Sequence, residues 1–260
     1  TNGALQNMDF VFERREIKYL LDEAQYIALL QKLAEREIMP DHYGKTTICN
    51  LYFDTPDFLL IRRSIEKPIY KEKLRVRSYG QLTKNGNVFV EIKKKYRSVV
   101  YKRRVVVDCA TMDSFMSGEP LSGGQTEKEI NYFMQFYANL VARMYIAYDR
   151  VAYFDEPDGL RLTIDDNIVW RDFDLSLYFR PYGKKILSDE QHLLELKVNG
   201  ALPLWLSEFL SQNKIFPTSF SKYGKAYMEL VKRQYAYDYL VKRGSATTDN
   251  ELIDEQKIAI

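Results

Sequence analysis

Hydrophobic and polar residues alternate with a period of two along many short segments of this chain. Such alternation predicts β-strands that bury one face. The predicted strands cover residues 10–21, 46–53, 70–79, 86–96, 99–108, 144–154, 159–166 and 191–198. Turn-forming sequences separate several of them, as at residues 84–87 and 156–159. The pattern therefore predicts a mainly antiparallel sheet.

Helical spacing of apolar residues interrupts this strand pattern. Residues 22–37 are predicted to form a helix with Asp22 as its N-cap, and Pro40 follows it. Further helices are predicted at residues 112–117, 126–142, 203–212 and 219–242. Strands and helices do not alternate in a βαβ rhythm, which favours an α+β fold. We expect one domain over residues 10–243, with a flexible tail from 244 to 260.

Composition narrows the class of protein. The 260 residues are 46% hydrophobic and 28% charged, which is typical of a globular chain with a full core. The net charge of +2 does not indicate a DNA partner. Two cysteines are too few for a disulfide framework, and no apolar run is long enough to span a membrane. With no signal-peptide pattern recognised, we expect a cytoplasmic location.

The polar face of the predicted strands is almost entirely charged. In residues 74–77 both arginines share a face while the aliphatic residues take the other. The same alternation recurs in most strands. Its cations are Arg14, Lys18, Arg75, Arg77, Lys93, Lys102, Arg104, Arg150, Arg161 and Lys197, and its carboxylates are Glu16, Glu91, Asp165 and Glu195.

A solvated sheet face explains any one strand, but solvated faces usually also contain Thr, Ser and Gln. We therefore expect an eight-stranded antiparallel sheet closed into a barrel, with helices outside and charges lining the interior. So many cations repel one another unless a polyanion binds among them. The few carboxylates of this face would then hold Mg²⁺ or Mn²⁺ beside phosphate oxygens, because these ions prefer hard oxygen ligands.

Seven segments also carry a family resemblance. Residues 12–19, 74–77, 91–93, 148–150, 161–165, 194–197 and 220–223 stand in the order seen in the VTC domain. This is the catalytic domain of vacuolar transporter chaperone polyphosphate polymerases, in the triphosphate tunnel metalloenzyme (CYTH-like) superfamily. Each motif alone is weak, but their order over residues 10–235 is fairly specific.

The resemblance implies an eight-stranded tunnel that binds ATP and polyphosphate or triphosphate. It implies a metal ligand in Glu195 and a C-terminal helix, beginning at Lys222, that closes the tunnel. We expect Glu91 or Asp165 to help Glu195 hold Mg²⁺ or Mn²⁺. Lys18 belongs to the same basic wall. The implied phosphate-binding residues are Arg75, Arg77, Lys93, Lys102, Arg150, Arg161 and Lys222; the strand pattern adds Arg104 and Lys197.

At two positions the chain differs from members of the superfamily. Arg14 stands where the superfamily's hydrolases have the first Glu of a Glu-x-Glu-x-Lys signature, which favours the VTC branch. Ser219 stands where the polymerases tend to have a lysine. Neither an SPX phosphate-sensing domain nor a membrane domain is recognised in these residues. Regulation, a membrane-protein partner and the oligomeric state are left open.

The sequence favours a polyphosphate polymerase that uses ATP with Mn²⁺ or Mg²⁺. A triphosphatase is the alternative, in which Glu16, Glu91 or Asp165 orients a water molecule. A non-catalytic polyphosphate, nucleotide or RNA-binding barrel and an unrelated surface-charged sheet also remain open. His42 and His192 lie in no metal or triad spacing and are expected to be structural.

Overall fold

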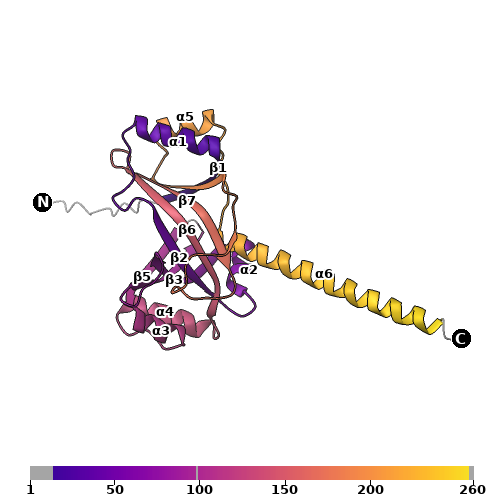
Figure 1. Cartoon of the computed structure of the whole chain (residues 1–260). Helices are drawn as coiled ribbons and strands as arrows, with labels where there is room; N and C mark the ends of the chain where they lie inside the picture. Colours follow the sequence, from indigo (N-terminus) through magenta and orange to yellow (C-terminus); the bar gives the residue numbers. More distant parts are fainter. Residues whose placement is uncertain (1–13, 98, 258–260) are drawn as a thin grey trace.

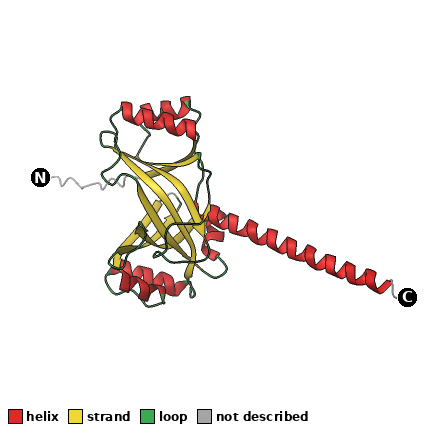
Figure 2. Ribbon diagram, viewed as in Figure 1, coloured by secondary structure: helices red, strands yellow, loops and turns green. Residues whose placement is uncertain are grey.

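The structure is a computed structural model that describes residues 14–97 and 99–257. One antiparallel sheet forms its centre, seen in yellow in Figure 2. Its strands are β1 (Arg14–Asp22), β2 (Thr46–Asp54), β3 (Tyr70–Tyr79), β4 (Asn87–Tyr96), β5 (Val99–Asp108), β6 (Val141–Asp155), β7 (Leu160–Arg171), β8 (Lys184–Lys185) and β9 (Gln191–Asn199). The predicted strands are thus confirmed, apart from residues 10–13, which lie outside the described part, and the two-residue β8 was not predicted.

The sheet is curled but open. Its strand order is β1-β9-β7-β6-β2-β3-β4-β5, with β8 added to β7. Among the described residues no backbone pairing joins β1 to β5, so the predicted closed barrel is wrong on this point. An ion pair of 3.6 Å nevertheless connects Lys93 of β4 with Glu16 of β1. These strands lie at opposite sides of the order, so the face that carries both side chains is concave.

The open seam has a physical reason in its side chains. Lys102 and Arg104 of β5 turn back to Glu91 of the neighbouring strand, at 2.7 and 3.8 Å. They therefore bring no complementary charge to β1. A ladder between two edges needs matched strand register and compatible facing side chains, and here Glu16 alone meets a cation across the seam in the described contacts.

Six helices accompany the sheet in the described part of the chain. They are α1 (Glu23–Glu35), α2 (Leu59–Ile65), α3 (Cys109–Met116), α4 (Gln125–Phe136), α5 (Leu204–Gln212) and α6 (Lys222–Lys257). Asp22 caps α1 as predicted, by accepting a hydrogen bond from the backbone N–H of Gln25 at 2.8 Å. The prediction of helix to residue 142 is wrong, because Ala138 takes a positive φ of 49° and β6 begins at Val141.

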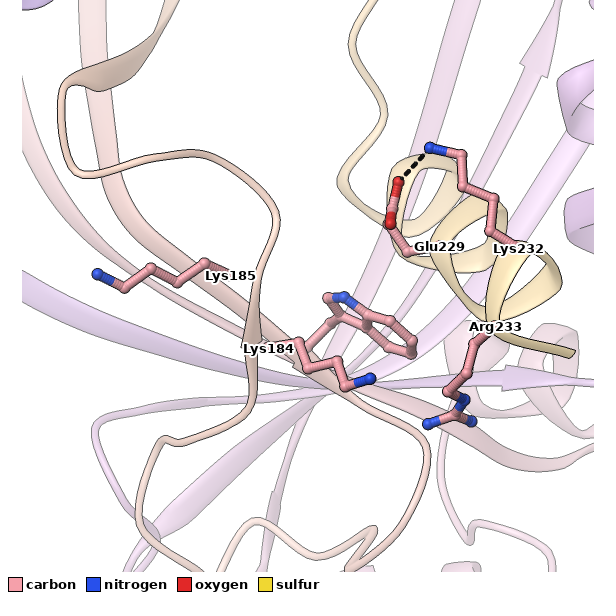
Figure 3. Close-up of a pocket in the computed structure, with 6 residues that line it drawn as sticks. Lys184, Lys185, Glu229, Lys232 and Arg233 are labelled. Atoms are coloured by element: carbon pink, nitrogen blue, oxygen red, sulfur yellow. Dashed lines mark hydrogen bonds and ion pairs between the residues drawn. The ribbon is translucent and has the colours of Figure 1, made fainter. Parts of the chain in front are cut away.

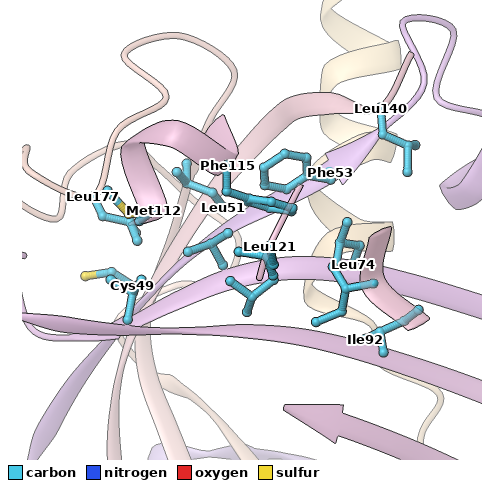
Figure 4. Packing of buried hydrophobic residues seen from close by; sticks show 14 of the residues in the cluster. Cys49, Leu51, Phe53, Leu74, Ile92, Met112, Phe115, Leu121, Leu140 and Leu177 are labelled. Carbon is cyan, nitrogen blue, oxygen red and sulfur yellow. The ribbon is translucent and has the colours of Figure 1, made fainter. Parts of the chain in front are cut away.

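The outer, convex face of the sheet is apolar and is covered by two helix pairs. Helices α3 and α4 pack over β2 to β5, where Leu51, Val76 and Phe115 are almost fully buried (Figure 4). Helices α1 and α5 pack at the other end, over β1, β7 and β9 (Figure 1). Burying these aliphatic faces stabilises the curl and leaves the alternate, charged positions on the concave side.

Helix α6 starts against the sheet and then projects away from it (Figure 1). It continues as helix to Lys257, beyond residue 242, where the sequence predicts its end. A single glycine in a helix costs only about 1 kcal/mol relative to alanine, so Gly244 does not stop it. No helix in the described residues is long and apolar enough to cross a membrane.

Candidate functional site

The concave face carries the charged residues that the strand pattern predicts. We call this set the charged face. Most of its members contact one another through three carboxylates, each surrounded by cations. Its residues are Glu16, Lys18, Lys73, Arg75, Arg77, Glu91, Lys93, Lys102, Arg104, Arg150, Arg161, Asp165, Glu195, Lys197 and, from α6, Lys222.

Glu91 lies at the centre of the first group. Its side chain is only 2% exposed. Burial acts to raise the pKa of Glu91, but Arg75, Arg77 and Lys102 outweigh it and lower the pKa to about 2. The carboxylate is therefore ionised at neutral pH and holds the basic side chains of β3 and β5 in place. The ion pairs join it to Arg75 at 2.7 Å, Lys102 at 2.7 Å, Arg77 at 3.8 Å and Arg104 at 3.8 Å.

Asp165 forms the second group on β7. Arg150 donates to both of its oxygens, from Nε at 2.5 Å and from Nη2 at 2.7 Å. Lys222 donates to Oδ2 from the first turn of α6. Burial acts to raise the pKa of Asp165, but Lys222 and Arg150 lower it overall. The predicted motif residue Lys222 is thus brought from the C-terminal helix onto the charged face.

Glu195 forms the third group, nearest the open seam. It accepts from Lys197 on its own strand and lies 3.6 Å from Lys18 of β1. Lys18 also reaches Glu16, at 3.5 Å. Burial acts to raise the pKa of Glu195, but Lys197 and Lys18 hold it well below its usual range. Glu195 is therefore ionised beside Glu16, with a lysine between them.

Two tyrosines close the deep end of the charged face. Arg75 donates to the hydroxyl of Tyr52 at 3.1 Å, and Arg77 donates to that of Tyr148 at 3.2 Å. Burial acts to raise the pKa of Tyr52, but Arg75, Lys73 and Arg77 lower it to about 8. Beyond these rings the concave face becomes apolar and is covered by α2 and α6, through Ile48, Ile61, Met144, Ile146, Ile168, Trp170, Leu193, Phe220, Tyr223 and Ala226.

Lys73 belongs to the charged face but was missed in the sequence. Its Nζ donates to the hydroxyl of Ser221 at 3.0 Å, and no carboxylate pairs with it among the described residues. Burial is the main cause that lowers the pKa of Lys73, to about 8. The signal was available, because residues 73, 75 and 77 share one strand face. Tyr148 was placed on this face by its alternation with Arg150, but Tyr52, between Leu51 and Phe53, carried no such signal.

Lys93 and Arg161 sit toward the outer part of the charged face. Lys93 pairs with Glu16, as described above. Arg161 lies opposite Lys197 in the β7–β9 register, and its residue is exposed. No ion pair engages Arg161 in the part of the chain that the structure describes. The guanidinium is therefore free to meet an anion at the opening of the curled sheet.

The oxygen atoms near Glu195 fit a divalent cation that is shared with phosphate. No group of three or more His, Cys, Asp or Glu residues in the described chain could hold a metal by itself. Thr163 lies opposite Glu195 in the β7–β9 register, and its hydroxyl is buried without a hydrogen-bond partner. Mg²⁺ usually takes one or two carboxylates and completes its shell with substrate phosphates and water. The oxygens of Glu195 face ammonium groups, as those of Glu91 and Asp165 face cations, but only Glu195 of these three has a free hydroxyl opposite it in strand register, that of Thr163.

Comparison with known proteins places the chain in a family. A family model described as the VTC domain matches residues 13–231. The chain therefore belongs to the VTC domain family. No curated protein matches the sequence.

Solved structures share the fold at low sequence identity. A protein of Hippeastrum named HpAC1, provisionally assigned as an adenylyl cyclase and described as having a dominant triphosphatase activity, is 17% identical with a TM-score of 0.51. The match covers 80% of this chain and 92% of that one. A provisionally assigned adenylate cyclase of Bacillus halodurans is 14% identical with a TM-score of 0.50, over 80% of this chain and 95% of that one.

Proposed function

We propose that this chain transfers the terminal phosphoryl group of ATP to a polyphosphate chain, with Mn²⁺ or Mg²⁺. The observation that carries the proposal is the excess of cations over carboxylates on one concave face. Lys73 and Arg161 remain without a carboxylate partner in the described residues, and the three buried carboxylates are each shared by two or more cations. Such a face is electrostatically incomplete until a polyanion binds.

The geometry of the side chains supports phosphate binding. Arg75, Arg77 and Arg150 are held by carboxylates or tyrosine hydroxyls, so they need little reorganisation to receive phosphate oxygens. Arginine supplies a bidentate fork, and Lys73 and Lys222 supply point charges. Phosphoryl transfer needs mainly this positioning and charge neutralisation. The attacking terminal phosphate of a growing chain is already anionic, so no residue has to act as its base.

The divalent cation is assigned to Glu195, with Thr163 beside it. When bound, the ion would neutralise charge on the phosphates. The carboxylate of Glu195 is ionised at neutral pH because Lys197 and Lys18 lower its pKa, and the same two lysines hold it on the charged face. Family members of the triphosphate tunnel class use divalent metals in general, which supports this assignment. Glu91 and Asp165 instead hold arginines in place.

A triphosphatase remains the second candidate, because HpAC1 with the same fold is described as having that activity. The two reactions differ only in the attacking group. In the hydrolytic case Glu16, 3.6 Å from Lys93 and near the open seam, is the carboxylate best placed to meet water. Glu91 and Asp165 are less suited, since their side chains are almost fully buried whereas that of Glu16 is partly exposed.

The test is to incubate the purified chain with ATP and Mn²⁺ or Mg²⁺ and resolve the products. We expect long polyphosphate on a stained gel and an equal yield of ADP per phosphate added. Release of inorganic phosphate without chains would establish the triphosphatase. If ATP is not consumed in the presence of either metal, the chain is a binding module and the proposal is refuted.

Glu195→Gln provides the matched variant for the metal assignment. We expect it to lower metal-dependent turnover by roughly 100-fold or more, because one hard ligand and its charge are lost. Binding of tripolyphosphate without metal should remain or tighten, since Lys18 and Lys197 lose their carboxylate partner. Glu190→Gln, a substitution in an exposed turn, serves as the control. Full turnover in Glu195→Gln would contradict the assignment.

A further inference from the structure

A second group of basic side chains lies outside the charged face, around a cavity between β7, β8 and α6 (Figure 3). The cavity has a volume of about 280 Å³ and is lined by Trp170, Lys184, Lys185, Glu229, Lys232 and Arg233. We call it the α6 pocket. The one lining carboxylate, Glu229, already pairs with Lys232 at 2.7 Å. The pocket therefore has an excess of positive charge.

Backbone pairing holds Lys184 at this pocket. Lys184 lies opposite Trp170 in the β7–β8 register, so their side chains share a face. The preceding residue, Gly183, approaches β7 so closely that a Cβ atom there would lie 2.3 Å from the carbonyl oxygen of Trp170. The next hydrogen bond, from the N–H of Ile186 to the carbonyl of Ile168, is 2.8 Å long. The backbone of Lys184 is thus placed by pairing with β7, through the two-residue strand β8.

The charges of this pocket are not all satisfied. No contact engages the ammonium of Lys184 within the described residues, while Lys185 pairs with Asp189 and Arg233 pairs with Asp172. Figure 3 shows Lys184 and Arg233 extending toward the same gap from β8 and α6. Trp170 also lines the pocket, and the guanidinium carbon of Arg233 lies 5.9 Å from the centre of its ring. The unpaired ammonium of Lys184 indicates that this pocket can take an anion.

We propose that the α6 pocket binds a small phosphate-bearing anion that bridges β8 and α6. Lys184 would act as a point charge and Arg233 as a bidentate fork toward the phosphate oxygens. The volume equals roughly nine waters at about 30 Å³ each, which admits one or two phosphate groups and not an extended chain. The same chemistry could come from an inorganic phosphate ion or from a phosphate ester.

This site is separate from the charged face. Arg233 follows Lys222 by eleven residues on α6, which corresponds to about 16 Å along the helix. The buried apolar zone around Trp170 and Tyr223 lies between them. The proposal therefore does not rest on the proposed function. Its structural consequence is a clamp on α6, since the anion would join this helix to β8.

The two tryptophans of the chain make the test specific. Trp205→Phe removes the indole of α5 and leaves Trp170 as the only tryptophan. In this protein we expect a saturable change in tryptophan fluorescence on titration with inorganic phosphate, pyrophosphate or glycerol phosphate, and none with chloride at equal ionic strength. The responses to the inorganic ions and to the ester distinguish the two sources of phosphate.

Substitutions at the pocket decide the assignment. In the Trp205→Phe background, Lys184→Gln should raise the half-saturation concentration of phosphate at least tenfold. Addition of Arg233→Gln to this variant should abolish the fluorescence response. Lys184 has no partner to lose, so the single variant keeps the fold. Lys84→Gln, at an exposed turn, is the control and should leave the titration unchanged.

Two results would overturn the proposal. One is a response that survives both pocket substitutions but disappears in Arg75→Gln, because the signal would then come from the charged face. The other comes from calorimetry with phosphate on Arg75→Gln, a variant weakened at the charged face. The proposal fails if this variant shows no phosphate binding, or binding that the further substitution Lys184→Gln does not remove. Binding that depends on Lys184 and not on Arg75 is the expected result.

Discussion

At the scale of single residues, the buried carboxylates of the charged face set its geometry. Glu91 pairs with four cations from β3 and β5, more than Asp165 or Glu195 pairs with. An anion in that position keeps the arginines ordered while no phosphate is bound. Its role is therefore expected to differ from that of Glu195, and substitution separates the two.

Glu91→Gln is expected to lower the free energy of unfolding at pH 7 by about 2–3 kcal/mol. Breaking a fully buried ion pair costs roughly 3–5 kcal/mol, and the partial exposure of Lys102 and Arg104 reduces this. The folded pKa of about 2 lies below the unfolded value of 4.5, so the stabilisation is present above pH 4.5 and is lost as pH falls toward 2. Chemical denaturation of both proteins across this range should show the difference shrinking with acid. A difference that stays constant from pH 7 to pH 2 would contradict this account.

Lys73 predicts a pH dependence of anion binding. Its pKa is lowered to about 8, mainly by burial, so it loses its charge as pH rises from 7 to 9. The neighbouring Tyr52, with a pKa also lowered to about 8, gains a negative charge over the same range. Both changes weaken polyanion binding. We expect the affinity for tripolyphosphate, measured by calorimetry without metal, to fall with rising pH, and to fall less in Lys73→Arg. Equal pH profiles for the two proteins would exclude a role for Lys73.

The sequence predicted most of these residues because strand alternation assigns side chains to faces. Arg75, Glu91 and Lys197 all lie where that rule puts them. Strand alternation could not predict the individual ion pairs, because these depend on which strands are neighbours in the sheet. The metal role of Glu91 and Asp165 stays a prediction, and neither has a free hydroxyl opposite it in strand register as Glu195 has in Thr163.

At the scale of elements, the first turn of α6 connects the helix to the concave face. The carbonyl of Phe220 accepts from Lys18 at 3.1 Å, Ser221 accepts from Lys73, and Lys222 donates to Asp165. The hydroxyl of Tyr223 donates to buried Asp54 at 2.8 Å. These contacts reach four different strands, so α6 fixes residues that are far apart in the sequence.

Tyr223→Phe tests this attachment. The carboxylate of Asp54 also accepts from the backbone N–H groups of Leu60 and Ile61, so the substitution removes one of several hydrogen bonds. We expect the free energy of unfolding to fall by about 1–2 kcal/mol, as for a buried hydrogen bond to a charged group. Tyr227→Phe alters a half-buried position whose hydroxyl forms no hydrogen bond within the described residues, and should change the free energy of unfolding by less than about 0.5 kcal/mol. Equal effects of the two substitutions, measured by urea unfolding, would show that the Asp54 contact is not what secures α6.

The longer elements were predicted from their periodic patterns, but the two shortest, α2 and β8, were not. Helix α2 has only seven residues, and its N-cap Phe58 takes a positive φ of 60° that no sequence pattern announces. Its stability comes from Asp54, which accepts from its first backbone N–H groups. The two residues of β8 are likewise too few to show an alternation.

At the scale of the whole molecule, the sheet is a curled, open sheet with the charged face inside. The sequence predicted the inner and outer faces but not the seam, because closure depends on the register between β1 and β5 and not on either strand alone. It also missed the apolar deep end. Ile48, Met144 and Ile168 occupy inner positions there, and α6 covers them. Our central proposal is that the charged face binds a polyphosphate anion.

Titration calorimetry with tripolyphosphate at pH 7 tests that claim most directly. We expect saturable binding, with an affinity at least tenfold lower in Arg77→Gln. We also expect added salt to weaken binding less in this variant than in the original chain, because the variant has lost a positive charge. Lys45→Gln, which alters an exposed lysine paired with Asp149, is the control and should leave binding unchanged. Saturable binding that depends on Arg77 and not on Lys45 is the predicted result. Binding that is absent, or equal in both variants, would contradict the account.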